Sequence, residues 1–246
     1  MLDRRDVTLC YDGTPDGLMS VIFYCYEHGV MPFSVITDKG LSLMPVERVL
    51  TDVRKADRVI NGIKKAAGQA AYDKIRLAML TGWPEKEINV LKYVALLLAE
   101  GKKAMYMQQE DCVSGIETHV RHLINEGHRY KEFIRFSVYG NLLYAKINPK
   151  NQVLPLIVNH FKQRFPEENF LIYDATNAQA AVYRPYSCEI LYEVNIKESD
   201  VDETELYYRR LWKTFYDAIE IKQRHNERCR MSCMPKRYWS NMPEFK

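Results

Sequence analysis

The sequence lacks any apolar run of the roughly 18 residues that a membrane-spanning helix needs. It also lacks a signal-peptide pattern, because the start MLDRRDVTLCYDG places charges before only a few apolar residues. Internal repeats and low-complexity segments are absent as well. In a chain of 246 residues, 47% hydrophobic and 27% charged residues exclude disorder and coiled coil. We therefore expect a cytoplasmic globular protein that makes no use of a membrane.

Cysteine is scarce and scattered, and without a secretory signal we expect reduced thiols rather than a disulfide framework. The last two cysteines have the first spacing of a radical SAM cluster motif, CxxxCxxC, but Lys236 stands at the third position. Two thiolates cannot hold a four-iron cluster, so we expect no bound cofactor. The six are Cys10, Cys25, Cys112, Cys188, Cys229 and Cys233.

Positive charge is unevenly placed. The whole chain carries only +3, from 35 Lys and Arg against 32 Asp and Glu. Residues 222–246 hold seven basic and two acidic residues, which gives +5, while the remaining 28 basic and 30 acidic residues give −2. A basic C-terminal segment is therefore expected, packed on a slightly acidic body or extending from it.

The order of periodic patterns predicts an α+β fold in a single compact domain over residues 1–246. The first half is mostly helical. Near Gly140-Asn141 the pattern changes to β-branched and aromatic runs, which is a good hairpin signal. The second half should hold a small antiparallel sheet, a hairpin plus a meander, with helices. The expected helices cover 18–28, three pieces within 55–99, 112–126, 153–165 and 202–223, the last capped by Asp200 or Asp202, and the expected strands cover 7–11, 133–139, 142–147, 170–173, 180–183 and 188–194.

The turn Tyr11-Asp12-Gly13-Thr14-Pro15-Asp16-Gly17 lies between a strand and a helix start, where free backbone N–H groups can bind an anion. It lacks the Lys-Ser/Thr of a phosphate-binding P-loop, and its two acids would repel phosphate. The simpler interpretation is a tight turn in which Thr14 or Asp16 caps the helix. Asp12 is kept as a candidate ligand-binding residue.

His119, His122 and Glu126 share one face of a predicted helix and could in principle bind zinc, with His128 nearby. The spacing is not HExxH, however, and His128 lies off that face. A solvated polar face explains the pattern more simply, so no metal site is predicted.

Charged residues gather at the ends of apolar elements, and Arg135 is expected at mid-strand between Ile134 and Phe136. A partly buried Arg needs a carboxylate or a phosphate partner. The cluster is either an internal Arg–Asp/Glu network or a pocket for a phosphate or base with an acid/base group. The candidate catalytic residues are Glu126, His128, His160 and Asp174, and the candidate ligand- or phosphate-binding residues are Asp12, Arg129, Arg135 and Arg164.

The basic segment interleaves cations with two aromatic residues. Cations attract phosphate, and aromatic rings can stack on unpaired bases. The alternative is a solvated face with a Trp that packs down as an anchor, and no helix-turn-helix, zinc-finger or RNP pattern is present. The candidate nucleic-acid-binding residues are Arg224, Arg228, Arg230, Lys236, Arg237, Tyr238 and Trp239.

Five segments together resemble a known family. They are YDGTPDGL, EGHRYKEFIRF, LLYAKINPKNQVLPLIVNHFKQRFPEENFLIYD, LWKTFYDAIEI and MPKRYW. In this order they are similar to the bacterial "probable DNA metabolism protein" family, a domain of unknown function. The matching positions are Asp12, Gly13, Gly17, Glu126, His128, Arg129, Phe133, Arg135, Phe136, His160, Phe161, Arg164, Phe165, Asp174, Trp212, Pro235, Arg237, Tyr238 and Trp239.

The resemblance implies a role beside a radical SAM protein of the spore-photoproduct-lyase-like kind, and a related domain is fused to uracil-DNA glycosylase-like proteins. Residues 175–177, Ala-Thr-Asn, depart from the pattern, where a basic residue is expected. We therefore expect a DNA metabolism or repair accessory protein that binds DNA and acts with that partner. The alternatives are an enzyme acting on a nucleobase or nucleotide, and a protein-binding adaptor for the partner.

Overall fold

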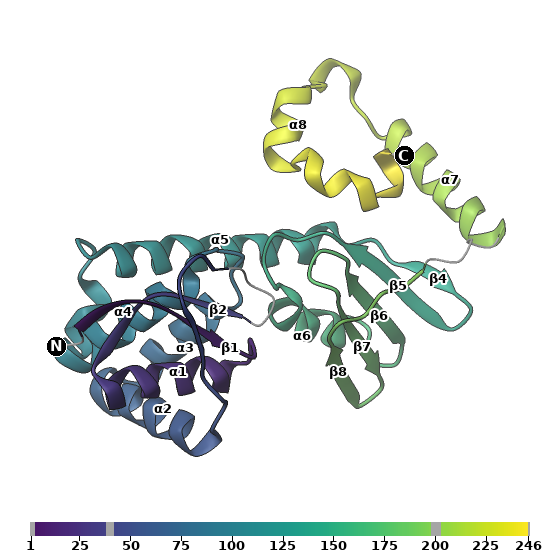
Figure 1. Cartoon of the computed structure of the whole chain (residues 1–246). Coiled ribbons are helices and arrows are strands. Elements are labelled where there is room, and N and C mark those ends of the chain that lie inside the picture. The colour runs from purple at the N-terminus through teal and green to yellow at the C-terminus, as the bar shows by residue number, and fades with distance from the viewer. Residues whose placement is uncertain (1–2, 38–41, 198–202, 246) are drawn as a thin grey trace. The chain divides into compact units, whose positions relative to one another are not determined.

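The computed structural model of the chain describes residues 3–37, 42–197 and 203–245 (Figure 1). They group into two compact units, one up to Leu123 and one from Ile124 onward, and each is described by itself. The overall class is α+β, as the sequence predicted. The single compact domain expected from the sequence stays a prediction. Among the described residues no helix is both long and apolar enough to cross a membrane.

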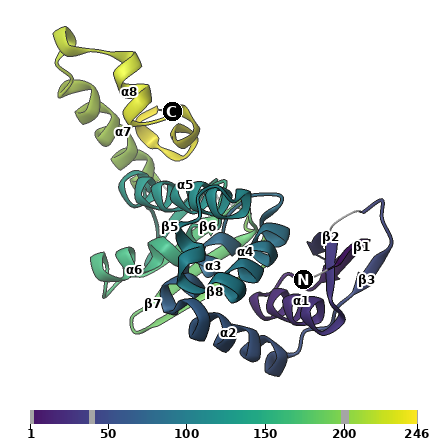
Figure 2. The ribbon, with the colours of Figure 1, turned by 90° about the vertical axis from the view of Figure 1, so that its left-hand side faces the viewer.

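The first unit combines a parallel sheet with helices. Its three strands are β1 (Asp3–Tyr11), β2 (Val30–Thr37) and β3 (Val46–Arg48), in the order β2-β1-β3. Figure 2 displays these strands beside α1 (Pro15–His28). The remaining helices are α2 (Val53–Ala67), α3 (Gln69–Met79), α4 (Lys86–Glu100), the 3-10 helix η1 (Gly101–Tyr106) and the first half of α5 (Asp111–Phe133).

Buried aliphatic side chains from β1 and from the helices form the core of this unit. Leu9 on the central strand, Ile22 on α1, Ile63 on α2 and Leu91 on α4 are all fully buried. Neither β2 nor β3 was predicted from the sequence. Pro32 weakens the strand pattern of β2 because proline cannot donate a ladder hydrogen bond, which an edge strand tolerates.

The second unit is built on a five-stranded sheet, in the order β4-β5-β6-β7-β8. Its strands are β4 (Ser137–Tyr139), β5 (Leu142–Ile147), β6 (Asn169–Asp174), β7 (Gln179–Arg184) and β8 (Ser187–Leu191). The predicted hairpin at Gly140-Asn141 joins β4 to β5. The wholly antiparallel sheet is a wrong prediction, since β5 and β6 are parallel. The helix α6 (Leu154–Arg164) lies between them in sequence, and parallel neighbours need such a crossover.

The position expected for Arg135 is also wrong. The predicted helix 112–126 continues as α5 to Phe133, because residues such as Arg129 and Lys131 are good helix formers. Residues 134–136 are irregular, so Arg135 lies in the connection between α5 and β4 rather than in a strand.

The C-terminal part of the second unit is helical. It holds α7 (Glu203–Ala218), α8 (Glu227–Cys233) and three short 3-10 helices, η2 (Lys222–Arg224), η3 (Lys236–Asn241) and η4 (Pro243–Phe245). The predicted caps Asp200 and Asp202 lie outside the described residues. The last residues are part of the packing, because Tyr238 and Met242 are buried.

Candidate functional site

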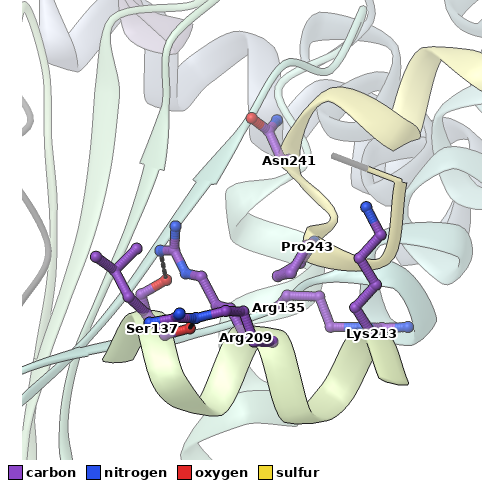
Figure 3. Close-up of a pocket in the computed structure, with 8 residues that line it drawn as sticks. Arg135, Ser137, Arg209, Lys213, Asn241 and Pro243 are labelled. Atoms are coloured by element: carbon purple, nitrogen blue, oxygen red, sulfur yellow. Dashed lines mark hydrogen bonds between the residues drawn. The ribbon is translucent and has the colours of Figure 1, made fainter. Parts of the chain in front are cut away.

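Two adjoining hollows lie beside α7, with volumes of about 430 Å³ and about 500 Å³. They share Arg135, Arg209 and Pro243, so we treat them as one feature, the α7 groove. Figure 3 shows the smaller hollow, with side chains from α7, from the start of β4 and from the C-terminal segment around it. All of its lining residues belong to the second unit.

One face of α7 lines the groove because Trp212 and Lys213 lie three and four residues after Arg209, which itself lies four residues after Glu205. Arg209 donates from Nε to Glu205 Oε1 at 2.8 Å. Its Nη2 donates to Ser137 Oγ at 2.6 Å (Figure 3). The other oxygen of Glu205 accepts the backbone N–H of Val138 at 3.2 Å. These bonds fix α7 to β4 and hold the guanidinium of Arg209 at the wall of the groove.

Arg135 is fixed at the centre of the groove. Its Nε and Nη2 donate to Glu244 Oε1 at 3.1 and 2.9 Å, and its Nη1 donates to the carbonyl of Glu132 at 3.1 Å. Its guanidinium also lies 6.0 Å from the centre of the Trp212 ring. The sequence left a carboxylate or a phosphate open as the partner of Arg135, and in the structure Arg135 pairs with the carboxylate of Glu244.

The lining of the groove is cationic on balance, with Arg135 and Arg209 ion-paired to Glu244 and Glu205. Among the residues that the structure describes, the carboxylates of Glu132 and Glu205 line it, and Glu244 is bonded to Arg135. Clustered like charges in a concave surface concentrate the local field and attract anions. The six basic residues that line the groove are Lys131, Arg135, Arg164, Arg209, Arg210 and Lys213.

Aromatic rings line the larger hollow. Phe136 packs edge-on against Phe161 and Phe165, with ring centres 5.3 and 5.5 Å apart. Tyr208 and Trp212 stand on α7 four residues apart, and both are exposed. The groove therefore offers cations and exposed aromatic side chains side by side.

Glu126 lies elsewhere, near the end of β5, and is buried. Its two oxygens accept the backbone N–H groups of Lys150 and Asn151 at 3.1 and 3.0 Å, and the side-chain amide of Asn151 at 2.7 Å. The guanidinium of Arg237 lies 3.2 Å from the same carboxylate. Glu126 thus joins α5, the loop before α6 and the C-terminal segment.

Asp174 ends β6 and is fully buried. Its carboxylate accepts the backbone N–H groups of Thr176 and Asn177, both at 3.0 Å, and the side-chain amide of Asn177 at 2.7 Å. Burial raises the pKa of Asp174, although these hydrogen bonds act in the opposite direction. Asn177 also donates to the carbonyl of Asn151 at 3.4 Å, which links the Asp174 turn to the loop that Glu126 holds.

The other candidates of the predicted cluster are dispersed. His128 is exposed and Arg129 half-buried on α5. His160 on α6 packs edge-on against Phe161, and its buried Nε2 has no hydrogen-bond partner among the described residues. Arg164 is exposed, lines the groove and lies 5.6 Å from the centre of the Phe165 ring. Of the predicted set, only Arg135 and Arg164 meet at the groove.

Asp12 organises the first turn of the first unit. It accepts the backbone N–H and the hydroxyl of Thr14 at 2.9 and 2.7 Å, and the hydroxyl of Thr51 at 2.7 Å. Burial acts to raise the pKa of Asp12, but these hydrogen bonds outweigh it and lower the pKa. Thr14 caps α1 by accepting the N–H of Gly17 at 3.0 Å, which confirms the capped-turn interpretation.

Some candidate nucleic-acid-binding residues of the tail contact other residues of the protein, and others are exposed cations. Tyr238 is buried edge-on against Tyr130 and Phe133, and Arg237 is paired with Glu126. Trp239 stacks on Phe245 at 4.3 Å, and Arg230 is paired with Glu227. Arg224, Arg228 and Lys236 are exposed, and so is Arg237 in spite of its pairing with Glu126.

The histidines of the considered metal motif have other contacts. His119 stacks on Trp83, with ring centres 4.3 Å apart, and hydrogen-bonds the carbonyl of Gly115. In the part of the chain that the structure describes, no group of three or more His, Cys, Asp or Glu side chains is placed to hold a metal ion.

Arg209, Arg210, Lys213 and Glu244 were missed as site residues by the sequence reading. The first three look like ordinary surface residues of an amphipathic helix, and nothing local connects Glu244 to Arg135. The signal that could have found the first three is their position beside Trp212, which is one of the residues that match the family.

The protein is thus an α+β protein whose second unit contains a groove lined by basic and aromatic residues. The chain belongs to the family described as DUF4130, a domain of unknown function, whose model matches residues 84–244. That span runs from the turn before α4 to η4 and includes the whole groove. No curated protein matches the chain.

Proposed function

We propose that this protein is a nucleic-acid-binding accessory protein of DNA metabolism or repair. The observation that carries the proposal is the α7 groove, in which six basic and two acidic residues of the described part of the chain surround two adjoining hollows. Phosphate contacts of Lys and Arg supply most of the sequence-independent affinity for nucleic acids. The exposed tail residues Arg224, Arg228 and Lys236 extend the proposed contact.

We further propose that the protein acts together with a radical SAM partner, and this part of the proposal is supported by the family resemblance alone. In that arrangement the radical chemistry is the partner's, because Lys236 stands where a third cluster cysteine would be needed. The cytoplasmic location stays a prediction.

The alternative enzyme on a nucleobase has weaker support. Glu126 and Asp174 both use their oxygens to hold backbone turns, so a general base would have to come from another residue. The adaptor alternative is favoured by one observation, the exposed apolar residues Tyr207, Leu211 and Phe215 on α7. Retention of the partner in a pull-down after nuclease treatment would support the adaptor.

The test is fluorescence anisotropy with labelled DNA at several salt concentrations, comparing Arg210→Glu with Arg184→Glu. Both arginines are exposed and in the second unit, but only Arg210 lines the groove. We expect Arg210→Glu to weaken binding about tenfold and to reduce the salt slope by about 1 or more, and Arg184→Glu to change neither. No binding of the unchanged protein at low salt, or equal affinities of the two variants, would contradict the proposal.

Arg228→Glu tests the tail in the same assay. A point substitution is preferable to removal of residues 222–246, because that removal would also delete the buried Tyr238, Met242 and Glu244. A weakening by Arg228→Glu supports a tail contact, and an unchanged affinity confines the contact to the groove.

A further inference from the structure

We infer that the α7 groove is a site for single-stranded nucleic acid, in which Tyr208 and Trp212 stack on unpaired bases while the flanking cations contact phosphates. This inference rests on the proposed function and names the form of nucleic acid that the site takes. It assigns the base contact to α7 and not to the aromatic residues of the basic tail.

The first support is the exposure of the two rings. Tyr208 is 62% and Trp212 40% exposed, although both line a hollow. Aromatic side chains of this size usually bury most of their surface, and exposed ones gathered at a concave site mark a binding surface. In the tail, by contrast, Tyr238 is buried and Trp239 is covered by Phe245.

The second support is the order of rings and cations along α7. Tyr208 and Trp212 are four residues apart, a rise of about 6 Å, so they stand on one face of the helix. Arg209, Arg210 and Lys213 alternate with them. Sites that bind single strands without sequence preference combine such rings with a positively charged groove that follows the backbone.

The third support is the fixed geometry of Arg135. Its hydrogen bonds to Glu244 hold the guanidinium 6.0 Å from the centre of the Trp212 ring. A cation and a ring are thus placed beside each other before any ligand arrives. A nucleotide likewise carries a phosphate and a base beside each other, so the two could contact the cation and the ring together. Less side-chain freedom is lost on binding when the site is already ordered in this way.

A double helix fits this site poorly. Its bases are stacked on one another and present only their edges in the grooves, so their faces are not available to the two rings. Volumes of about 430 and about 500 Å³ lie in the range of small-ligand sites, roughly 300–1,000 Å³. Each hollow therefore suits a group of nucleotide size better than the broad surface of a duplex.

The chain offers matched controls for both rings. The exposed aromatic neighbours on the same helix are unsuitable, because Tyr207 packs against Tyr208 and Phe215 against Trp212. Tyr186 and Tyr192 of the second unit are exposed, at 96% and 66%, and neither lines the groove. The experiment compares Tyr208→Ala and Trp212→Ala with Tyr186→Ala and Tyr192→Ala. The probes are a labelled thymidine oligonucleotide, a uridine oligonucleotide of equal length, and the thymidine strand paired with its complement.

We expect Tyr208→Ala and Trp212→Ala each to weaken single-strand binding about five- to hundredfold and to leave duplex binding within about twofold. Tyr186→Ala and Tyr192→Ala should bind all probes as the unchanged protein does. A preference between the thymidine and uridine strands would tell DNA from RNA, and either preference supports the inference. Trp212→Phe keeps a ring and should retain most of the affinity, which separates stacking from misfolding.

The result that would overturn the inference leaves the proposed function standing. It is an unchanged single-strand affinity of Tyr208→Ala and Trp212→Ala while Arg210→Glu weakens binding. An equal loss for single strands and duplex would also overturn it. If Arg210→Glu has no effect either, the proposed function itself fails.

Discussion

Arg135 and Glu244, 109 positions apart in the chain, share two hydrogen bonds at one carboxylate oxygen. The Glu244 side chain is almost completely buried, and its second oxygen, also buried, has no hydrogen-bond partner among the described residues. The pair fastens the last turn of the chain to the connection between α5 and β4. It also holds the central cation of the α7 groove in place.

Replacement of Glu244 should therefore loosen the C-terminal segment. We expect Glu244→Gln to lower the free energy of unfolding by about 1–3 kcal/mol, because a charge-assisted hydrogen bond becomes a neutral one and a buried amide needs new partners. Arg135 is 29% exposed, so solvent screening keeps the loss in the lower part of that range. Urea unfolding measures it, with Glu167→Gln, an exposed glutamate, as control. Equal unfolding midpoints of the two variants would contradict the role of the pair.

Two helical glycines should respond in opposite ways to the same substitution. A Cβ on Gly115 in α5 would lie 2.6 Å from Cη2 of Trp83, whereas one on Gly62 in α2 would meet only Leu98, at 3.8 Å. Gly62→Ala should raise the free energy of unfolding by up to about 1 kcal/mol, the usual gain within a helix. Gly115→Ala should lower it by about 1–3 kcal/mol, because the ring stacked on His119 must move. Thermal unfolding of both variants checks the signs, and a stabilising Gly115→Ala would refute the packing argument.

The fold class followed from the sequence, and so did the elements with strong local patterns. The hairpin at Gly140-Asn141 is an example, because Gly140 adopts the positive φ of +61° that the turn requires. The parallel pairing of β5 with β6 was missed although its signal was present, since a strand, a helix and a strand follow one another from 142 to 174.

The site was less accessible to sequence reasoning. Arg135 was recognised as a residue in need of a carboxylate or a phosphate, but its pairing with Glu244 is made by tertiary packing over more than a hundred residues. The groove cations on α7 carry no distinctive spacing. Residues that hold turns, such as Glu126 and Asp174, have the same chemical types as catalytic carboxylates, so only their hydrogen-bond partners tell the two apart.

The cysteines should differ sharply in reactivity. Burial raises the pKa of Cys25 to about 12, so its reactive thiolate is scarce at neutral pH. Cys229 and Cys233 are exposed. We expect a thiol reagent at pH 8 to label these two within minutes, and to label the buried Cys10, Cys25 and Cys112 only after denaturation. Mass spectrometry of the labelled peptides measures the order, and early labelling of Cys25 would contradict the described core.

Asp174 should make part of the stability depend on pH. Burial raises its pKa in the folded protein, so between its unfolded value of about 4 and the folded value the folded state holds the proton more tightly than the unfolded state does. The resulting stabilisation is fully present below the unfolded pKa and is lost as the pH rises through the folded pKa. Asp174→Asn has no proton to release at this position and keeps one carbonyl oxygen for the N–H groups of Thr176 and Asn177.

The free energy of unfolding of the unchanged protein minus that of Asp174→Asn should therefore decrease as the pH rises above about 4, and should become constant once Asp174 is ionised in both states. Urea unfolding of both proteins at several pH values between 4 and 7 measures this difference. A difference that increases with pH would mean that the hydrogen bonds from the 176–177 turn outweigh burial. The carboxylate would then be held as an anion by that turn, as Asp12 is held by Thr14 and Thr51 in the first unit.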